Sequence, residues 1–253
     1  MLREYKDWLS ESYSRETAET YYKRLCRLLA GQSVTDTVGK LDMQMVLDKL
    51  GEIKHKNYFS QCKNAFLRFC EFKNITLPSD VLENIKQFDG CTKKKYRKRN
   101  IIDYKAIDSA IKRIKKDKLR LSYQTAIATG LRVSELASIS PCDCEISADE
   151  IMFSFIGKGG DQEAATVQAV EHPQLYQSVV NLIENTKTNK KVFYSAIYLQ
   201  KTASELGFKC HDLRRICAKL EYKKCRNKGE VKLKLRHSNI KTTGIYLRSK
   251  VKF

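Results

Sequence analysis

The chain has 253 residues, of which 42% are hydrophobic, so it can bury two modest cores without disulfides or structural metals. Its formal net charge of +19 indicates a polyanionic partner, most simply nucleic acid. No apolar run reaches membrane-spanning length, and the first residues form an amphipathic segment rather than a signal peptide, which argues against membrane and secreted proteins. We therefore expect a soluble, cytoplasmic protein.

Residues 1–90 are predicted to be helical throughout, as a bundle of four or five short helices. Ser14 is placed to cap one helix, and apolar stripes at 41–50 and 57–72 predict two more. The run Pro78-Ser79-Asp80 marks the start of another helix. Aromatic residues at helical spacing usually face inward, so we interpret these as the core rather than a base-stacking platform: Trp8, Tyr21, Phe59, Phe66 and Phe69.

Charge divides the chain at residues 91–100, which carry six positive side chains and no acidic one. Residues 1–90 have 14 basic and 13 acidic side chains, whereas residues 91–253 have 34 and 16. We predict two domains, 1–90 and 101–253, joined by this linker. A solvated linker is one interpretation, but we favour a basic strap lying along phosphates. Its cations are Lys93, Lys94, Lys95, Arg97, Lys98 and Arg99.

The second half is predicted to be mainly helical with one hairpin. Asp103 is expected to cap a helix through Lys116, and further helices are predicted at 119–129, after Arg132, and at 174–185, 195–206 and 211–226. Two strands, 150–156 and 164–170, flank a glycine-rich turn at 157–160. The predicted fold class is therefore mainly α with a small antiparallel β-sheet.

The nine cysteines are an odd number and contain no CxxC pair, so we interpret them as reduced thiols. Cys142 and Cys144 could chelate a metal, but no second CxC or HxxxH completes a tetrahedral site. The sequence predicts no metal site.

Three segments carry residues suited to phosphate chemistry: Thr129-Gly-Leu-Arg-Val-Ser-Glu-Leu136, His211-Asp-Leu-Arg-Arg215 and Arg236-His-Ser-Asn-Ile-Lys-Thr-Thr-Gly-Ile-Tyr246. Cutting a phosphodiester without a metal requires a nucleophile, cations for the non-bridging oxygens and an acid for the leaving oxygen. Arg132 and Arg214 are the natural clamp, because each guanidinium can bind two phosphate oxygens.

Helical spacing suggests partners for both arginines. Glu135 follows Arg132 by three residues and could orient it, although an ordinary ion pair explains the spacing nearly as well. His211 and Arg214 share the same spacing, so a helix starting near His211 would point both at one phosphate. Arg215 and Arg236, beside the motifs, are interpreted as DNA-backbone or surface contacts.

Lys158, in the predicted turn, is a candidate general acid because it falls between the two arginine motifs, although turn lysines are commonly just solvated. Glycines around it would let the loop approach DNA closely.

His237 and Tyr246 are nine residues apart, which in one straight helix would put them on opposite sides. Ser238 could instead cap a new helix at Asn239, so that both side chains converge on one phosphate. A free tyrosine has a pKa near 10 and needs neighbouring cations or a base to attack at neutral pH. A packed aromatic is the alternative for Tyr246, but the spacing from His237 favours the nucleophile.

Taken together, these motifs resemble the active site of the tyrosine recombinases, the phage-integrase family. The resemblance implies a SAM-like core-binding domain in 1–90 and a catalytic domain in 101–253. It implies that Tyr246 forms a 3′-phosphotyrosyl bond, that Glu135 supports the site, and that the scissile phosphate is activated by Arg132, Lys158, His211, Arg214 and His237. One departure is Arg236, which stands where many members have glycine.

The same resemblance implies recombination of double-stranded DNA at a specific site, through a Holliday junction within a homo-tetramer, without metal or ATP. It leaves open whether accessory DNA-bending proteins assist and which mobile element is served. A type IB topoisomerase-like nicking-closing enzyme and a non-cleaving architectural DNA-binding protein are the alternatives.

Overall fold

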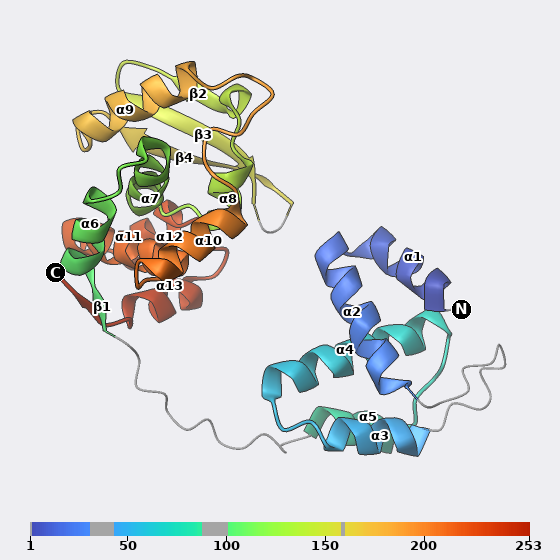
Figure 1. The fold of residues 1–253 in the computed structure, drawn as a ribbon. Coiled ribbons are helices and arrows are strands. Elements are labelled where there is room, and N and C mark those ends of the chain that lie inside the picture. Colours follow the sequence, from blue (N-terminus) through green and yellow to red (C-terminus); the bar gives the residue numbers. More distant parts are fainter. Residues whose placement is uncertain (1, 31–42, 88–100, 158–159) are drawn as a thin grey trace. The chain divides into compact units, whose positions relative to one another are not determined.

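The computed structural model describes residues 2–30, 43–87, 101–157 and 160–253. The chain forms two compact units, Met1–Arg97 and Lys98–Phe253, each of which is described by itself (Figure 1). The predicted basic segment from Lys93 to Arg99, and Lys158, lie outside the described residues. Within the described ranges, no helix combines the length and apolarity that a membrane crossing requires.

The first unit is a helical bundle whose elements are α1 (Leu2–Ser12), α2 (Arg15–Leu28), α3 (Met43–Gly51), α4 (Lys56–Phe72) and α5 (Ser79–Gln87). α2 packs along α4. Phe59, Phe66 and Phe69 are buried, and Trp8 and Tyr21 pack against them, which confirms the predicted aromatic core. Ser14 stands at the N-cap of α2 as predicted, but its hydroxyl donates to the Thr17 hydroxyl (3.0 Å) rather than capping the backbone.

The second unit combines eight helices of the described residues with a small sheet. The helices are α6 (Tyr104–Lys112), α7 (Asp117–Thr129), α8 (Val133–Ser138), α9 (Pro173–Glu184), α10 (Ala196–Glu205), α11 (Cys210–Cys225), α12 (Lys228–Lys234) and α13 (Ile240–Leu247). The antiparallel sheet has the order β2 (Cys144–Ile146), β3 (Glu150–Ile156) and β4 (Gln162–Gln168), and a short 3-10 helix (Pro141–Asp143) precedes it. The predicted fold class is confirmed.

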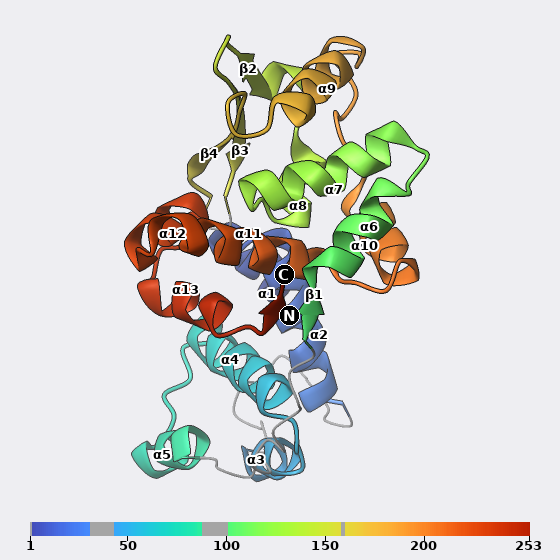
Figure 2. The same cartoon turned by 90° about the vertical axis from the view of Figure 1, so that its left-hand side faces the viewer.

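α7 lies between the sheet and α11 in both views (Figures 1 and 2). α11 contacts α7, α10, α12 and α13, so a residue on α11 can meet groups from most of the helical layer. In the sheet, Phe153 on β3 pairs with Ala165 on β4, and both are buried in the main core of this unit. The strand pair β1 (Ile102–Asp103) and β5 (Val251–Lys252) is parallel and was not predicted.

Several boundaries differ from the sequence prediction. Asp103 caps α6 by accepting from the Ala106 amide (3.0 Å), but α6 ends at Lys112 rather than Lys116. The last helix is capped by Asn239, whose side chain accepts from the Lys241 amide (2.8 Å), so the cap lies one residue beyond Ser238. β4 starts and ends two residues before the predicted strand.

Candidate active site

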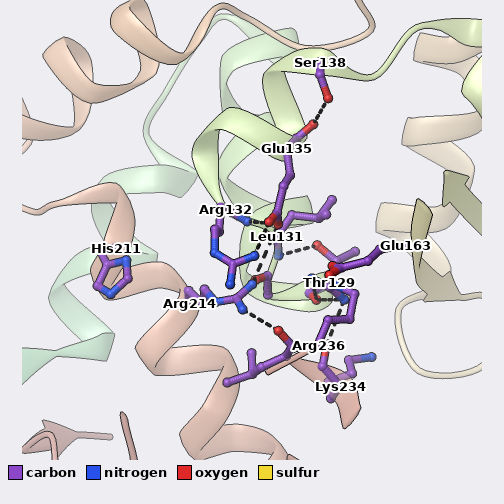
Figure 3. Close-up of polar contacts among 12 residues, drawn as sticks. Thr129, Leu131, Arg132, Glu135, Ser138, Glu163, His211, Arg214, Lys234 and Arg236 are labelled. Atoms are coloured by element: carbon purple, nitrogen blue, oxygen red, sulfur yellow. Dashed lines mark hydrogen bonds and ion pairs between the residues drawn. The ribbon is translucent and has the colours of Figure 1, made fainter. Parts of the chain in front are cut away.

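Arg132 is the N-cap residue of α8 and has an extended backbone, so it lies just before the helix and not within it. Glu135, on the first turn, is 4% exposed and accepts a hydrogen bond from the Arg132 amide (2.7 Å) while pairing with the Arg132 guanidinium. The same carboxylate lies 3.8 Å from Nη1 of Arg214. Figure 3 shows the two guanidinium groups side by side below Glu135. One carboxylate therefore orients both arginines.

Arg214 enters from α11 and is only 1% exposed. Its terminal nitrogens donate to the backbone carbonyls of Gly130 and Leu235, and its Nε is buried with no hydrogen-bond partner. Burial, followed by the charge of Arg132, lowers the pKa of Arg214 from its ordinary value. A guanidinium has five N–H donors, so Arg214 is fixed by two of them and keeps others for an anion.

The hydroxyl of Tyr246 lies 2.8 Å from Nε2 of His211, and the two rings are 5.2 Å apart. Although His211 reaches the surface, partial burial and the positive charges of Arg215 and Arg214 lower its pKa. A neutral imidazole has an acceptor nitrogen, so His211 can accept the proton of the tyrosine hydroxyl.

His237 follows α12 and packs against the Tyr246 ring, with ring centroids 4.9 Å apart. Its Nδ1 is 3.0 Å from the Thr243 hydroxyl, and its Nε2 is buried with no partner. Burial, followed by the charges of Arg214 and Arg132, lowers its pKa to about 4. The imidazole is therefore neutral, and the tautomer in which Nδ1 accepts from the Thr243 hydroxyl presents an N–H at Nε2.

Tyr246 itself is 9% exposed and packs on a small apolar cluster from α11 and α12: Cys217, Ala218, Val231 and Leu235. The Arg214 guanidinium lies 6.0 Å from the centre of the Tyr246 ring. The apolar cluster fixes the ring, and His211 contacts its hydroxyl.

Two cavities open on either side of Arg132. One, of about 450 Å³, is lined by Arg132, His211 and Arg214 together with residues of α8 and α10. The other, of about 700 Å³, is lined by Arg132, Glu163, Arg236 and His237 among others. Among the described residues, the first cavity is lined by cations and an imidazole and by no carboxylate, so it suits a phosphate, whereas Asp161 and Glu163 also line the second.

The structure thus brings together Glu135 and five of the predicted site residues, namely Arg132, His211, Arg214, His237 and Tyr246. Arg215 lies at the edge, with 38% of its side chain exposed, and pairs with Asp212 at 3.0 Å. The Arg236 guanidinium lies inside the protein, with 12% of its side chain exposed.

Two residues of this region escaped the sequence prediction. Thr243 lies within the last motif, six residues after His237 and three before Tyr246, and this spacing is the signal that could have identified it. Glu163, at the start of β4, had no signal of its own.

No protein-family model and no curated protein sequence matches this chain. Solved structures do match. A lambda integrase tetramer bound to a Holliday junction has a TM-score of 0.68 at 15% identity, covering 97% of this chain and 75% of that one. XerH site-specific recombinase bound to its difH substrate, before cleavage, has a TM-score of 0.61 at 17% identity, covering 90% and 74%. The Tn1549 transposon integrase with circular intermediate DNA has a TM-score of 0.60 at 15% identity, covering 97% and 94%.

This chain therefore has the fold of the tyrosine recombinases and integrases over nearly its whole length.

Proposed function

We propose that this protein is a site-specific DNA recombinase or integrase that cleaves and rejoins DNA through a 3′-phosphotyrosyl bond on Tyr246, without metal or ATP. One observation carries the proposal. The Tyr246 hydroxyl lies within hydrogen-bonding distance of Nε2 of His211, and its ring packs against the rings of His211 and His237 and lies 6.0 Å from the Arg214 guanidinium.

In the proposed step, the Tyr246 oxygen attacks the phosphorus while its proton passes to Nε2 of His211. Arg132, Arg214 and the Nε2–H of His237 donate to the non-bridging oxygens, where charge develops in the transition state. The bond from phosphorus to the 5′ oxygen breaks, and that oxygen takes up a proton. Lys158 remains the candidate donor from the sequence. Religation by a 5′ hydroxyl reverses each transfer.

The two units support a division of labour. We assign 1–90 to DNA binding as a core-binding domain and 101–253 to catalysis, with the basic linker and Arg215 as phosphate contacts. The lambda integrase match is a tetramer bound to a Holliday junction. By analogy, we propose that four copies of this chain assemble on two double-stranded sites, to move or resolve a mobile element.

Because the recognised DNA site is unknown, the test uses duplexes of random sequence. A pool of nicked 60-base-pair duplexes, random at the centre, is incubated with the protein, and covalent adducts are recovered under denaturing conditions and sequenced. We expect adducts with the native protein and none with Tyr246→Phe, which keeps the ring packing. The recovered site is then offered with a second duplex to measure strand exchange.

The outcomes separate the alternatives. Binding without any adduct would contradict the enzyme and favour an architectural protein. Adducts without any strand exchange would favour the topoisomerase-like enzyme.

A further inference from the structure

The end of α12 has the hydrogen bonds of a Schellman motif. The His237 amide donates to the Lys232 carbonyl (3.0 Å) and the Arg236 amide to the Leu233 carbonyl (2.9 Å), with Arg236 at φ +52°. This left-handed position is usually glycine, because any other side chain costs free energy there. The arginine side chain must therefore contribute something that glycine could not.

The Arg236 side chain joins three segments. Its terminal nitrogens lie 3.4 and 3.5 Å from the Thr129 carbonyl, and one of them donates to the Lys234 carbonyl at 2.8 Å. Its Nε lies 3.5 Å from Oε2 of Glu163, and the guanidinium lies 5.4 Å from the centre of the Phe155 ring. The contacts among Arg236, Thr129, Lys234 and Glu163 are visible in Figure 3.

Each joined segment leads directly to the candidate site. Thr129 precedes the turn that carries Arg132, and Lys234 precedes the turn that carries His237. Phe155 and Glu163 belong to the two strands of the β3–β4 hairpin. A single buried cation therefore connects the loop of one phosphate-binding candidate, the loop of another, and the hairpin beside them.

Glu163 supplies the negative charge that pairs with the Arg236 guanidinium. Its side chain is 24% exposed, and it covers the backbone at Gly157, where an added Cβ would lie 2.4 Å from Oε1. A buried guanidinium requires a counter-charge, and a carboxylate lining a phosphate cavity would by itself repel DNA. The ion pair supplies the counter-charge, while Nε of Arg236 and Oε2 of Glu163 make no hydrogen bond within the described residues.

We propose that Arg236 and Glu163 form a positioning pair, which holds the hairpin and the loops of Arg132 and His237 in mutual register before DNA arrives. This inference rests on the proposed function. Loss of Arg236 should therefore slow cleavage but leave DNA affinity nearly unchanged, because its guanidinium binds protein groups. Small displacements of catalytic groups lower the rate by large factors.

The test uses the full chain and the duplex recovered from the random pool. The variants are Arg236→Gly, which suits the left-handed backbone, Glu163→Gln, and the double variant. We expect adduct formation at saturating DNA to slow by about ten- to hundredfold in each single variant, and the double variant to be no slower than the worse single. DNA affinity should change by less than about threefold, with an unchanged salt dependence.

Glu171→Gln is the matched control, because it removes the same charge from an ion pair with Lys224 (2.9 Å) outside the site and should leave cleavage unchanged. Thermal unfolding checks each variant. If Arg236→Gly does not fold, Glu163→Gln carries the same comparison.

Two results would overturn the pair. In the first, Arg236→Gly weakens DNA binding and lowers the salt slope by about one, which identifies a phosphate contact. In the second, both single variants cleave at the native rate. Absence of any adduct with the native protein would instead remove the proposed function itself, so the two failures are distinguishable.

Discussion

At the scale of single residues, Glu135 is the group on which the site's electrostatics depend. Its carboxylate lies between the guanidinium groups of Arg132 and Arg214, of which the second is buried. Two positive charges so close would repel each other without it. The helical spacing predicted a link to Arg132, but the contact with Arg214 joins residues far apart in sequence and could not be foreseen.

Replacing this carboxylate tests its role. Because Glu135→Gln leaves two guanidinium groups without their counter-charge, we expect the free energy of unfolding to fall by about 3 kcal/mol. Urea unfolding measures the change. Glu171→Gln, in a half-exposed pair, should cost less than about 1 kcal/mol. Equal losses in the two variants would contradict the assigned role.

His237 makes stability depend on pH. Its folded pKa of about 4 lies below the ordinary value of 6.5, so between these values the unfolded chain binds more protons. This contribution to stability is therefore fully present above pH 6.5 and is lost as the pH falls toward 4. In urea unfolding at pH 5 and pH 7, His237→Gln should show a smaller difference than the native protein. An identical difference would show that His237 is not buried in its neutral form.

At the scale of elements, the turn between α7 and α8 sets the position of both arginines. Gly130 ends α7 at φ +65°, and its carbonyl accepts from Arg214. An added Cβ would lie 2.6 Å from Cδ2 of Leu235 and 3.0 Å from Sγ of Cys217. This close approach ties α7 to α11 and α12.

Gly130→Ala should therefore be costly in two ways. Backbone strain contributes about 1–2 kcal/mol and overpacking about 1–3 kcal/mol more. Gly207→Ala is the control, since Gly207 has φ +83° but nothing within 4 Å of an added Cβ, so only the strain applies. Denaturant unfolding compares them. A loss in Gly130→Ala no larger than in the control would mean that the turn is not tightly packed.

The sequence predicted the long elements well and the short ones poorly. Apolar periodicity located α4 and β3 almost to the residue. The early end of α6 had no glycine or proline to mark it, and β2 has three residues without alternating burial. The sequence marks Arg236 only as a departure from the usual glycine. Its left-handed backbone belongs to the Schellman motif, and its side chain makes a tertiary contact with Glu163. Such features depend on packing between distant segments, which local pattern does not encode.

At the scale of the whole molecule, the two units have separate cores and very different charge. One core includes Tyr5 and Phe66 and the other Phe153 and Leu213, and among the described residues none belongs to both. Residues 1–90 are nearly neutral, whereas the rest of the chain carries a net of +18. Each unit has the apolar content to fold alone.

This asymmetry predicts how DNA binding responds to salt. A fragment of residues 91–253 should fold and retain most of the salt slope of the full chain, because the slope counts phosphates neutralised by cations. Residues 1–90 alone should show a smaller slope than the fragment of residues 91–253. DNA affinity measured between 50 and 200 mM salt checks this. A steep slope for residues 1–90 would show that the phosphate contacts do not follow the distribution of net charge.

The most direct test of the account is chemical identification of the residue that becomes attached to DNA. The adduct from the random pool is digested with nuclease and protease, and the modified peptide is sequenced by mass spectrometry. We expect a nucleotide joined through its 3′ phosphate to the peptide that contains Tyr246. Attachment to any other of the thirteen tyrosines, or through a 5′ phosphate, would contradict it.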